Sequence, residues 1–197
     1  VLASFGRHES AQEAETPGMV YSDLLARVHR RLAAEWGVPV GEAQDAAFGR
    51  SVGDWPAFAD SGEALAYLKQ FYKLVILSNV DRASFARSAE KLGVVFDAVY
   101  TAEEIGSYKP DLRNFRYMLD RLKAAGVAPA DILHTAQSLF HDHAPANALG
   151  LPSAWIDRRG AAAGSGATPP PPAGVHWDFR FPGMAEFAAA HRAELAR

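Results

Sequence analysis

Short apolar segments alternate with longer helical stretches from residue 61 to the end of the chain, and this alternation constrains the fold most strongly. Apolar runs of strand length occur at 74–77, 96–100, 131–136 and 153–157, with a weaker one at 175–179. Stretches of helical periodicity separate them, at 61–71, 83–92, 112–125, 144–149 and 184–195. Strands that alternate with helices favour a parallel sheet covered by helices, so the sequence predicts an α/β fold.

The first part of the chain has a purely helical pattern. Apolar residues recur at helical spacing before Gly37, a residue type that often ends a helix, and Ser22 stands at the expected N-cap. A second short helix is expected over 42–48. We therefore predict a helical subdomain at 1–58 and an α/β core at 59–197, with the boundary near residue 59.

Composition and charge exclude several classes of protein. The chain has 20 Lys and Arg against 23 Asp and Glu, which gives a net charge of −3, and no basic stripe predicts a nucleic-acid partner. No apolar run approaches the roughly 20 residues that a membrane span needs. The absence of cysteine excludes disulfides and thiolate chemistry and agrees with a cytoplasmic location. The Gly/Pro-rich segment 160–174 is expected to be a loop.

Polar residues follow three of the predicted strands, at the point where each strand ends. In an open parallel sheet, ligands bind beyond the carboxyl ends of the strands, so we expect these residues to surround one pocket. The candidates are Ser78, Asn79, Lys109, Gln137, Ser138 and Asp142. Hydroxyl and amide groups can donate hydrogen bonds to a carboxylate or phosphate, and a lysine supplies positive charge. The sequence therefore predicts a site for a small anionic substrate, with Asp142 orienting Lys109 or assisting a metal ion.

Each candidate also has an ordinary structural interpretation. Asp142 could cap the helix that follows it, and the residues after the first strand could form a turn. His141 and His143 flank Asp142, but no second cluster of ligands accompanies them, so we predict no metal site there. His134 lies within a predicted strand and is expected to be a hydrogen-bonded core residue. The order of the polar residues, each at a strand end, favours the functional interpretation.

Three segments together resemble the haloacid dehalogenase superfamily, and most of all its type II 2-haloacid dehalogenase-like members. They are LVILSN, GSYKPD and HTAQSLFHDHAPANALGLPSAWIDR. The resemblance implies a Rossmann-like parallel sheet core with an inserted helical cap. It implies that Ser78 and Asn79 bind the anionic group of the substrate, and that Lys109 neutralises charge beside a nucleophilic aspartate. Asp142 matches the second acid of the fourth motif, where Gln137 and Ser138 are further candidates for contact with the substrate.

The chain departs from the family pattern at specific positions. No D-x-[DY]-G-T nucleophile motif is present, so we expect the aspartate and the first strand to lie upstream of Val1, and the chain as given to be inactive. Gln137 replaces an acid that phosphatase members use for Mg²⁺, which favours the metal-free dehalogenases. Phe115 and Leu139 stand where dehalogenases have a tyrosine and an amide.

The resemblance therefore predicts a hydrolase that acts on carbon–halide bonds through an aspartyl ester, without a cofactor. Two alternatives stay open: a Mg²⁺-dependent small-molecule phosphatase of the same superfamily, and a truncated member that binds anions without catalysis. A small anion is the expected partner, and nucleic acid and membrane are not. Members of this superfamily often dimerise, so a homodimer is a further expected possibility for this protein.

Overall fold

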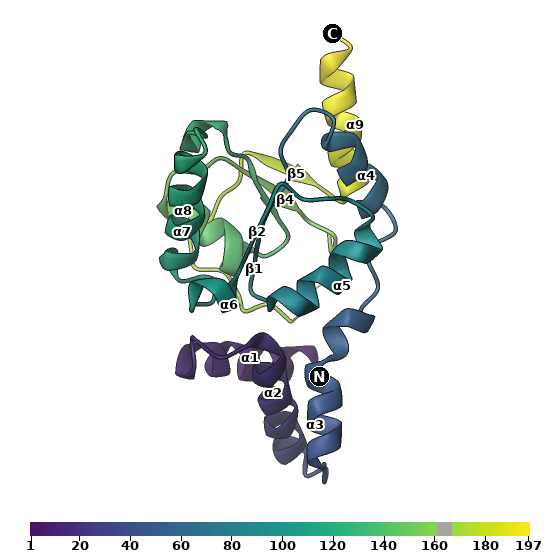
Figure 1. The fold of residues 1–197 in the computed structure, drawn as a ribbon, viewed down its shortest axis with the longest axis vertical. Helices are drawn as coiled ribbons and strands as arrows, with labels where there is room; N and C mark the ends of the chain where they lie inside the picture. The colour runs from purple at the N-terminus through teal and green to yellow at the C-terminus, as the bar shows by residue number, and fades with distance from the viewer. Residues whose placement is uncertain (161–166) are drawn as a thin grey trace.

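The computed structural model describes residues 1–160 and 167–197, so part of the loop predicted at 160–174 lies outside the described residues. Its first part is a helical layer. The helices of this layer are α1 (Leu2–Glu15), α2 (Tyr21–Trp36) and α3 (Glu42–Gly49), followed by the 3₁₀ turn η1 (Ser51–Asp54). Figure 1 shows α1, α2 and α3 together below a separate body that holds the strands. The division near residue 59 stays a prediction.

Strands and helices alternate in the rest of the chain. The strands are β1 (Val75–Ser78), β2 (Ala98–Thr101), β3 (His134–Ala136), β4 (Ser153–Ile156) and β5 (Phe179–Phe181). The helices are α4 (Ser61–Leu68), α5 (Arg82–Leu92), α6 (Ala102–Ile105), α7 (Leu112–Ala124), α8 (Ala144–Ala148) and α9 (Met184–Leu195). A 3₁₀ turn, η2 (Pro129–Asp131), precedes β3, and one π-helical turn, η3 (Leu139–His143), follows it. The predicted α/β fold with parallel strands is confirmed.

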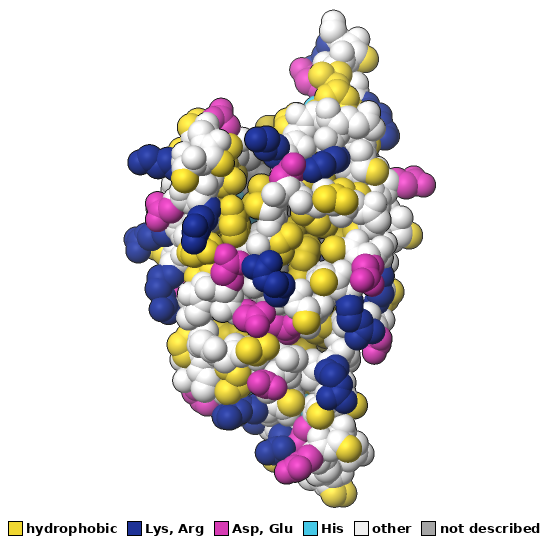
Figure 2. Space-filling view, viewed as in Figure 1, with side chains coloured by type: hydrophobic (Ala, Val, Ile, Leu, Met, Phe, Trp, Pro, Cys, Tyr) yellow, Lys and Arg dark blue, Asp and Glu magenta, His cyan; other side chains and the backbone are white. Residues whose placement is uncertain are grey.

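The strands form two parallel sheets rather than one continuous sheet. One sheet pairs β1 with β2, and the other has the order β3–β4–β5. No strand pairing joins β1 to β3 among the described residues. Strands in the middle of a parallel sheet are normally buried on both faces, yet every residue of β1 and β3 is only partly buried. Both strands therefore have a free edge, and Figure 2 shows hydrophobic side chains in a hollow of this region.

Two apolar clusters hold the fold together. In one, α2 buries Leu24, Leu25 and Val28 at helical spacing, and Tyr108 of the α/β core packs with them. The other lies under α7, which buries Phe115 and Met118 against the sheets. Burying one side chain of this size contributes about 1.5–3 kcal/mol relative to leaving it in water. The first cluster therefore joins the two layers through apolar contacts, and the second belongs to the α/β core alone.

Several predicted boundaries were wrong. Ser22 is not the N-cap of α2, because the helix begins at Tyr21, which is buried in the apolar cluster, and Val20 precedes it. The last strand is Phe179–Phe181 rather than 175–179, because its register is set by pairing with β4, where Ala154 faces Phe179. The helical character of the first part of the chain and the four strands before β5 agree with the helical and apolar patterns of the sequence.

A close approach of two helices in the helical layer requires a glycine. A Cβ atom on Gly49 would lie 2.3 Å from the backbone oxygen of Ser22, whereas a Cβ on Gly18 would meet nothing within 4 Å. We expect Gly49→Ala to lower the free energy of unfolding by about 1–3 kcal/mol, because α2 and α3 must separate. Gly18→Ala is the control and should change it by less than about 0.5 kcal/mol. Urea unfolding measures both, and equal effects would contradict this packing.

Candidate active site

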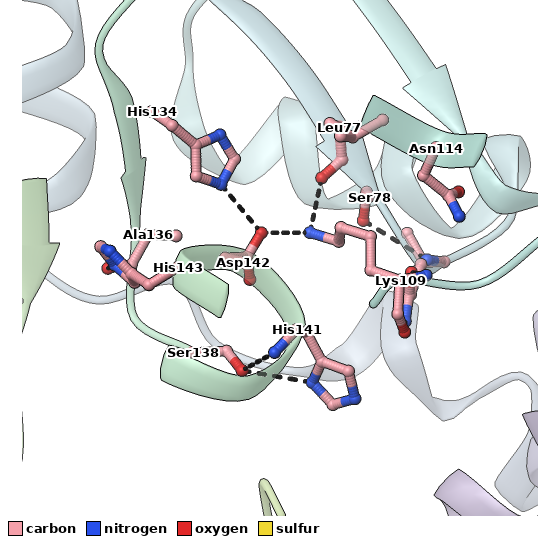
Figure 3. Close-up of polar contacts among 12 residues, drawn as sticks. Leu77, Ser78, Lys109, Asn114, His134, Ala136, Ser138, His141, Asp142 and His143 are labelled. Atoms are coloured by element: carbon pink, nitrogen blue, oxygen red, sulfur yellow. Dashed lines mark hydrogen bonds and ion pairs between the residues drawn. The ribbon is translucent and has the colours of Figure 1, made fainter. Parts of the chain in front are cut away.

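A buried ion pair lies at the centre of the candidate site. Lys109 Nζ donates to Asp142 Oδ1 at 2.7 Å and to the backbone oxygen of Leu77, in β1, at 2.8 Å. The side chains of Lys109 and Asp142 are each 10% exposed. Figure 3 shows the two side chains pointing toward each other from opposite sides of the gap between β1 and β3. The free edge of β1 thus has a positive charge beside its carboxyl end.

Asp142 is ionised in this environment. Burial alone would raise the pKa of its carboxyl, but the charge of Lys109 and the hydrogen bond from His134 more than offset burial and hold the pKa well below its usual range. His134 Nε2 lies 3.1 Å from Asp142 Oδ1, and the His134 ring packs 5.0 Å from that of Phe115. Asp142 is therefore a buried negative charge in contact with Lys109.

The residues after β1 hold the Lys109 loop in place. The backbone N–H of Lys109 donates to Asn79 Oδ1 at 2.7 Å, and Asn79 Nδ2 donates to the backbone oxygen of Lys109 at 3.1 Å. The Ser78 hydroxyl accepts from the backbone N–H of Val80 at 3.3 Å. Both side chains therefore lie at the same end of β1 as the ion pair.

The residues after β3 are arranged around a tight turn. The Ser138 hydroxyl accepts from the backbone N–H of His141 at 2.9 Å and lies 3.2 Å from His141 Nδ1. Gln137 is exposed, and its backbone oxygen accepts from Trp155 Nε1 at 3.0 Å. Within the described chain, no hydrogen bond joins the Gln137 side chain to the ion pair. The structure thus gathers five of the six predicted site residues and leaves Gln137 at the surface, and their roles stay predictions.

Helix α1 covers this site with acidic side chains that the sequence analysis did not single out. Glu9, Gln12 and Glu13 of α1 are buried. Glu13 Oε1 accepts from Asn79 Nδ2 at 3.0 Å, and Glu9 accepts from the Tyr21 hydroxyl. The helical spacing of these residues with Gly6 was the available signal, but a run of acids on a helix usually indicates a solvated face.

Burial changes the ionisation of the covering acids. It raises the pKa of Glu13 to about 8, with the charge of Glu9 as the next contribution, against the hydrogen bond from Asn79 and the charge of Lys109. Burial also raises the pKa of Glu9. The pKa of His141 falls to about 4 because its ring is buried. At neutral pH, Glu13 and His141 are therefore both uncharged beside the ion pair.

His134 also belongs to the site. We expected a hydrogen-bonded core residue, and His134 is indeed hydrogen-bonded and half-buried, but its partner is Asp142. The signal for this contact was its position on the strand that leads directly into the loop of Asp142. His143 lies behind the turn, fully buried between Ser153 and the backbone oxygen of Ala136. It is therefore a packing residue that faces away from the ion pair.

The donor set does not suit a bound metal ion. Asp142 Oδ1 is already in contact with Lys109 and His134, and Gln137 offers only a neutral amide. Among residues 1–160 and 167–197, no group of three or more His, Asp or Glu side chains could hold an ion. Mg²⁺ prefers several anionic oxygens, so these residues do not fit it, and no step is assigned to a metal.

Comparison with known proteins places the chain in a family. Residues 8–135 match the haloacid dehalogenase-like hydrolase family. The chain is 33% identical over 107 residues to an (S)-2-haloacid dehalogenase of Burkholderia cepacia, an alignment that covers 53% of this chain and 45% of that protein. The chain thus spans about half the length of this curated relative. It belongs to the haloacid dehalogenase-like hydrolase family.

Solved structures share the fold. The L-2-haloacid dehalogenase of Xanthobacter autotrophicus with covalently bound chloropropionic acid has a TM-score of 0.79 at 17% identity, and the match covers 96% of this chain and 84% of that one. A second L-2-haloacid dehalogenase has a TM-score of 0.75 at 21% identity, over 94% of this chain and 83% of that one. This likeness confirms the predicted Rossmann-like core with a helical cap. No described helix has both the length and the apolar character needed to cross a bilayer.

Proposed function

We propose that the whole protein hydrolyses a short 2-halocarboxylic acid through an aspartyl ester. The buried Lys109–Asp142 pair beside the free edge of β1 is the observation that carries this proposal. A buried lysine at the carboxyl end of a parallel strand can keep a neighbouring carboxylate ionised and in place as a nucleophile. The names of the relatives support a halocarboxylic acid as the substrate.

The nucleophile is proposed to lie upstream of Val1. The free edges of β1 and β3 face a gap that one more parallel strand would fill, and the half-buried state of both strands supports this. An aspartate at the carboxyl end of such a strand would lie next to Lys109. Its carboxylate would attack C2 of the substrate, form an ester and release the halide, and water would then hydrolyse the ester to a 2-hydroxy acid and restore the aspartate.

The residues of this chain would have separate roles in that reaction. Lys109 would hold the nucleophile, and Asp142 would orient Lys109 or assist the hydrolytic water. Ser78 and Asn79 would bind the carboxylate of the substrate. Ser138 is a further candidate for that contact, and Gln137 would need to turn inward to reach the substrate. A monoanionic haloacid can be balanced by one lysine and hydrogen bonds, so the proposed reaction uses no metal.

Halide release tests the proposal. The protein produced with its native residues upstream of Val1 is expected to release chloride from 2-chloropropionate without added metal. Lys109→Met should lower the rate by about 10²–10³-fold, because the nucleophilic carboxylate loses the positive charge that keeps it ionised and in place. Lys69→Met is the matched control, since Lys69 forms a surface pair with Asp97, and it should leave the rate unchanged. Mg²⁺-dependent turnover of phosphate esters without halide release would replace the proposal with the phosphatase alternative.

A further inference from the structure

The carboxyl group of Glu13 fills a position that a small carboxylate could occupy. Its Oε1 accepts from Asn79 Nδ2 at 3.0 Å, and its Oε2 lies 3.8 Å from His141 Nε2. Glu13 is only 7% exposed, although it lies on a helix of the outer layer. The amide that we assign to the carboxylate of the substrate therefore holds a carboxyl group of the chain itself.

The core side of this contact presents donors. Asn79 offers its amide, Lys109 offers charge, and His141 offers Nε2, which is buried without a hydrogen-bond partner. The Ser138 hydroxyl accepts from the backbone N–H of His141, so its own proton is free to point at Nδ1, 3.2 Å away. That arrangement places the proton of the neutral ring on Nε2, the nitrogen that faces Glu13.

The acids at this contact come from α1. Glu9 and Glu13 of α1 are both buried: Glu13 accepts from Asn79 of the core, and Glu9 accepts from the Tyr21 hydroxyl of α2. If α1 moved away, the carboxyl groups of Glu9 and Glu13 would leave together. The core would retain the donors of Asn79 and His141 and the charge of Lys109. Such a rim suits a carboxylate, because donors and positive charge both favour an anion.

We propose that Glu13 occupies the place of the carboxylate of the substrate, and that α1 must be displaced before a small carboxylate binds to Asn79. This inference rests on the proposed function, because it takes Asn79 as part of the substrate site. Lys109 and Asp142 are buried as well, with exposed fractions of only 8% and 7%. Two surface hollows of the helical layer, one that includes Phe5 and Trp36 and one that includes Asp45 and Arg50, do not contain either residue.

An ionised ligand has an advantage over Glu13 at this place. Burial keeps the Glu13 carboxyl uncharged at neutral pH, whereas a short carboxylic acid in water is ionised. The attraction of Lys109 for a full negative charge therefore favours the ligand over the neutral side chain. Glu13 thus works as a specificity residue, because only a group that interacts with the core more strongly than a neutral carboxyl displaces it.

Titration with propionate tests this inference on the 197-residue chain. Propionate has the carboxylate of the proposed substrate but no leaving group, so binding is measured without chemistry. Glu13→Ala is expected to bind propionate at least about tenfold more tightly than the unaltered chain, because the competent state no longer needs α1 to be displaced. Glu13→Gln retains an oxygen for Asn79 and should stay close to the unaltered chain. The matched control Glu15→Ala, on the exposed face of the same helix, should not gain affinity.

The outcomes separate this inference from the proposed function. Equal propionate affinity of the Glu13→Ala and Glu15→Ala variants would overturn the inference. So would a gain in affinity of Glu13→Ala for the uncharged propionamide that equals its gain for propionate. Adding Asn79→Ala to Glu13→Ala should remove the gain, and a gain that persists would also overturn it. Tighter propionate binding without halide release by the extended protein would leave the inference standing and remove the proposed function. Halide release by the extended protein without a gain in propionate affinity would overturn the inference and leave the proposed function standing.

Discussion

Lys109→Met is expected to lower the free energy of unfolding by about 3–5 kcal/mol, because it leaves the buried Asp142 carboxylate without its positive partner. His134 remains within 3.1 Å of Asp142, but its hydrogen bond does not replace a full positive charge. Replacing both members together, with Lys109→Met and Asp142→Leu, should recover most of the loss, since two apolar side chains need no charge compensation. Urea unfolding at constant pH measures all three proteins.

A surface ion pair provides the control for this experiment. Lys69 and Asp97 lie in contact like the central pair, but their side chains are 33% and 34% exposed. Lys69→Met should therefore cost no more than about 1 kcal/mol, because water and salt screen an exposed pair. If Lys109→Met and Lys69→Met had equal effects, the central pair would not be buried as described.

The stability of the protein is expected to fall as the pH rises from about 4.5 to 8, because of Glu13. Its folded-state pKa of about 8 lies above its ordinary value of 4.5, so the folded protein retains a proton in this range that the unfolded chain has lost. Between the two pKa values, this one group should lower the free energy of unfolding by about 1.4 kcal/mol for each unit that the pH rises. Above the folded-state pKa, both states are ionised and the decrease should end.

Glu13→Gln isolates this effect. Glutamine retains an oxygen that accepts from Asn79 but cannot ionise, so the variant should match the unaltered protein near pH 5 and exceed it by about 2–4 kcal/mol at pH 8. Other titratable groups lie around the Glu13 carboxyl and are the same in both proteins. They are Glu9 and Tyr21 of the helical layer and Lys109, His141 and Asp142 of the core. Urea unfolding from pH 5 to pH 8 measures the slope, and parallel curves for the two proteins would contradict a protonated Glu13.

The sequence indicated the site through the order of its strands. Lys109 and Asp142 are 33 positions apart, and their meeting follows from the parallel arrangement, which brings the carboxyl ends of neighbouring strands to one edge. Local patterns did not indicate the split of the sheet between β1 and β3, because both strands have ordinary apolar composition, and only the missing nucleophile motif pointed to an absent strand. The register of β5 was also beyond local patterns, since pairing with β4 determines where that strand begins.

The contribution of α1 depended on tertiary packing. Glu9 and Glu13 are spaced like the solvated face of a surface helix, and they are buried only because α1 packs against other parts of the chain, with Tyr21 on Glu9 and Asn79 on Glu13. A Cβ atom on Gly6 would lie within 2.0 Å of the backbone oxygen of Ala167, which is a contact between residues far apart in the chain. Nothing in the helical periodicity of α1 could have predicted that contact, or the burial of the acids that depends on the same placement.

A single turnover in ¹⁸O-labelled water tests the central claim most directly. The protein with its native upstream residues is mixed in excess with 2-chloropropionate, and both the product and the protein are analysed by mass spectrometry. We expect the 2-hydroxy acid to carry unlabelled oxygen from an aspartate, and the label to enter the protein when water hydrolyses the ester beside Lys109 and Asp142. Label that enters the product in the first turnover, with none in the protein, would show direct attack by water and contradict the account.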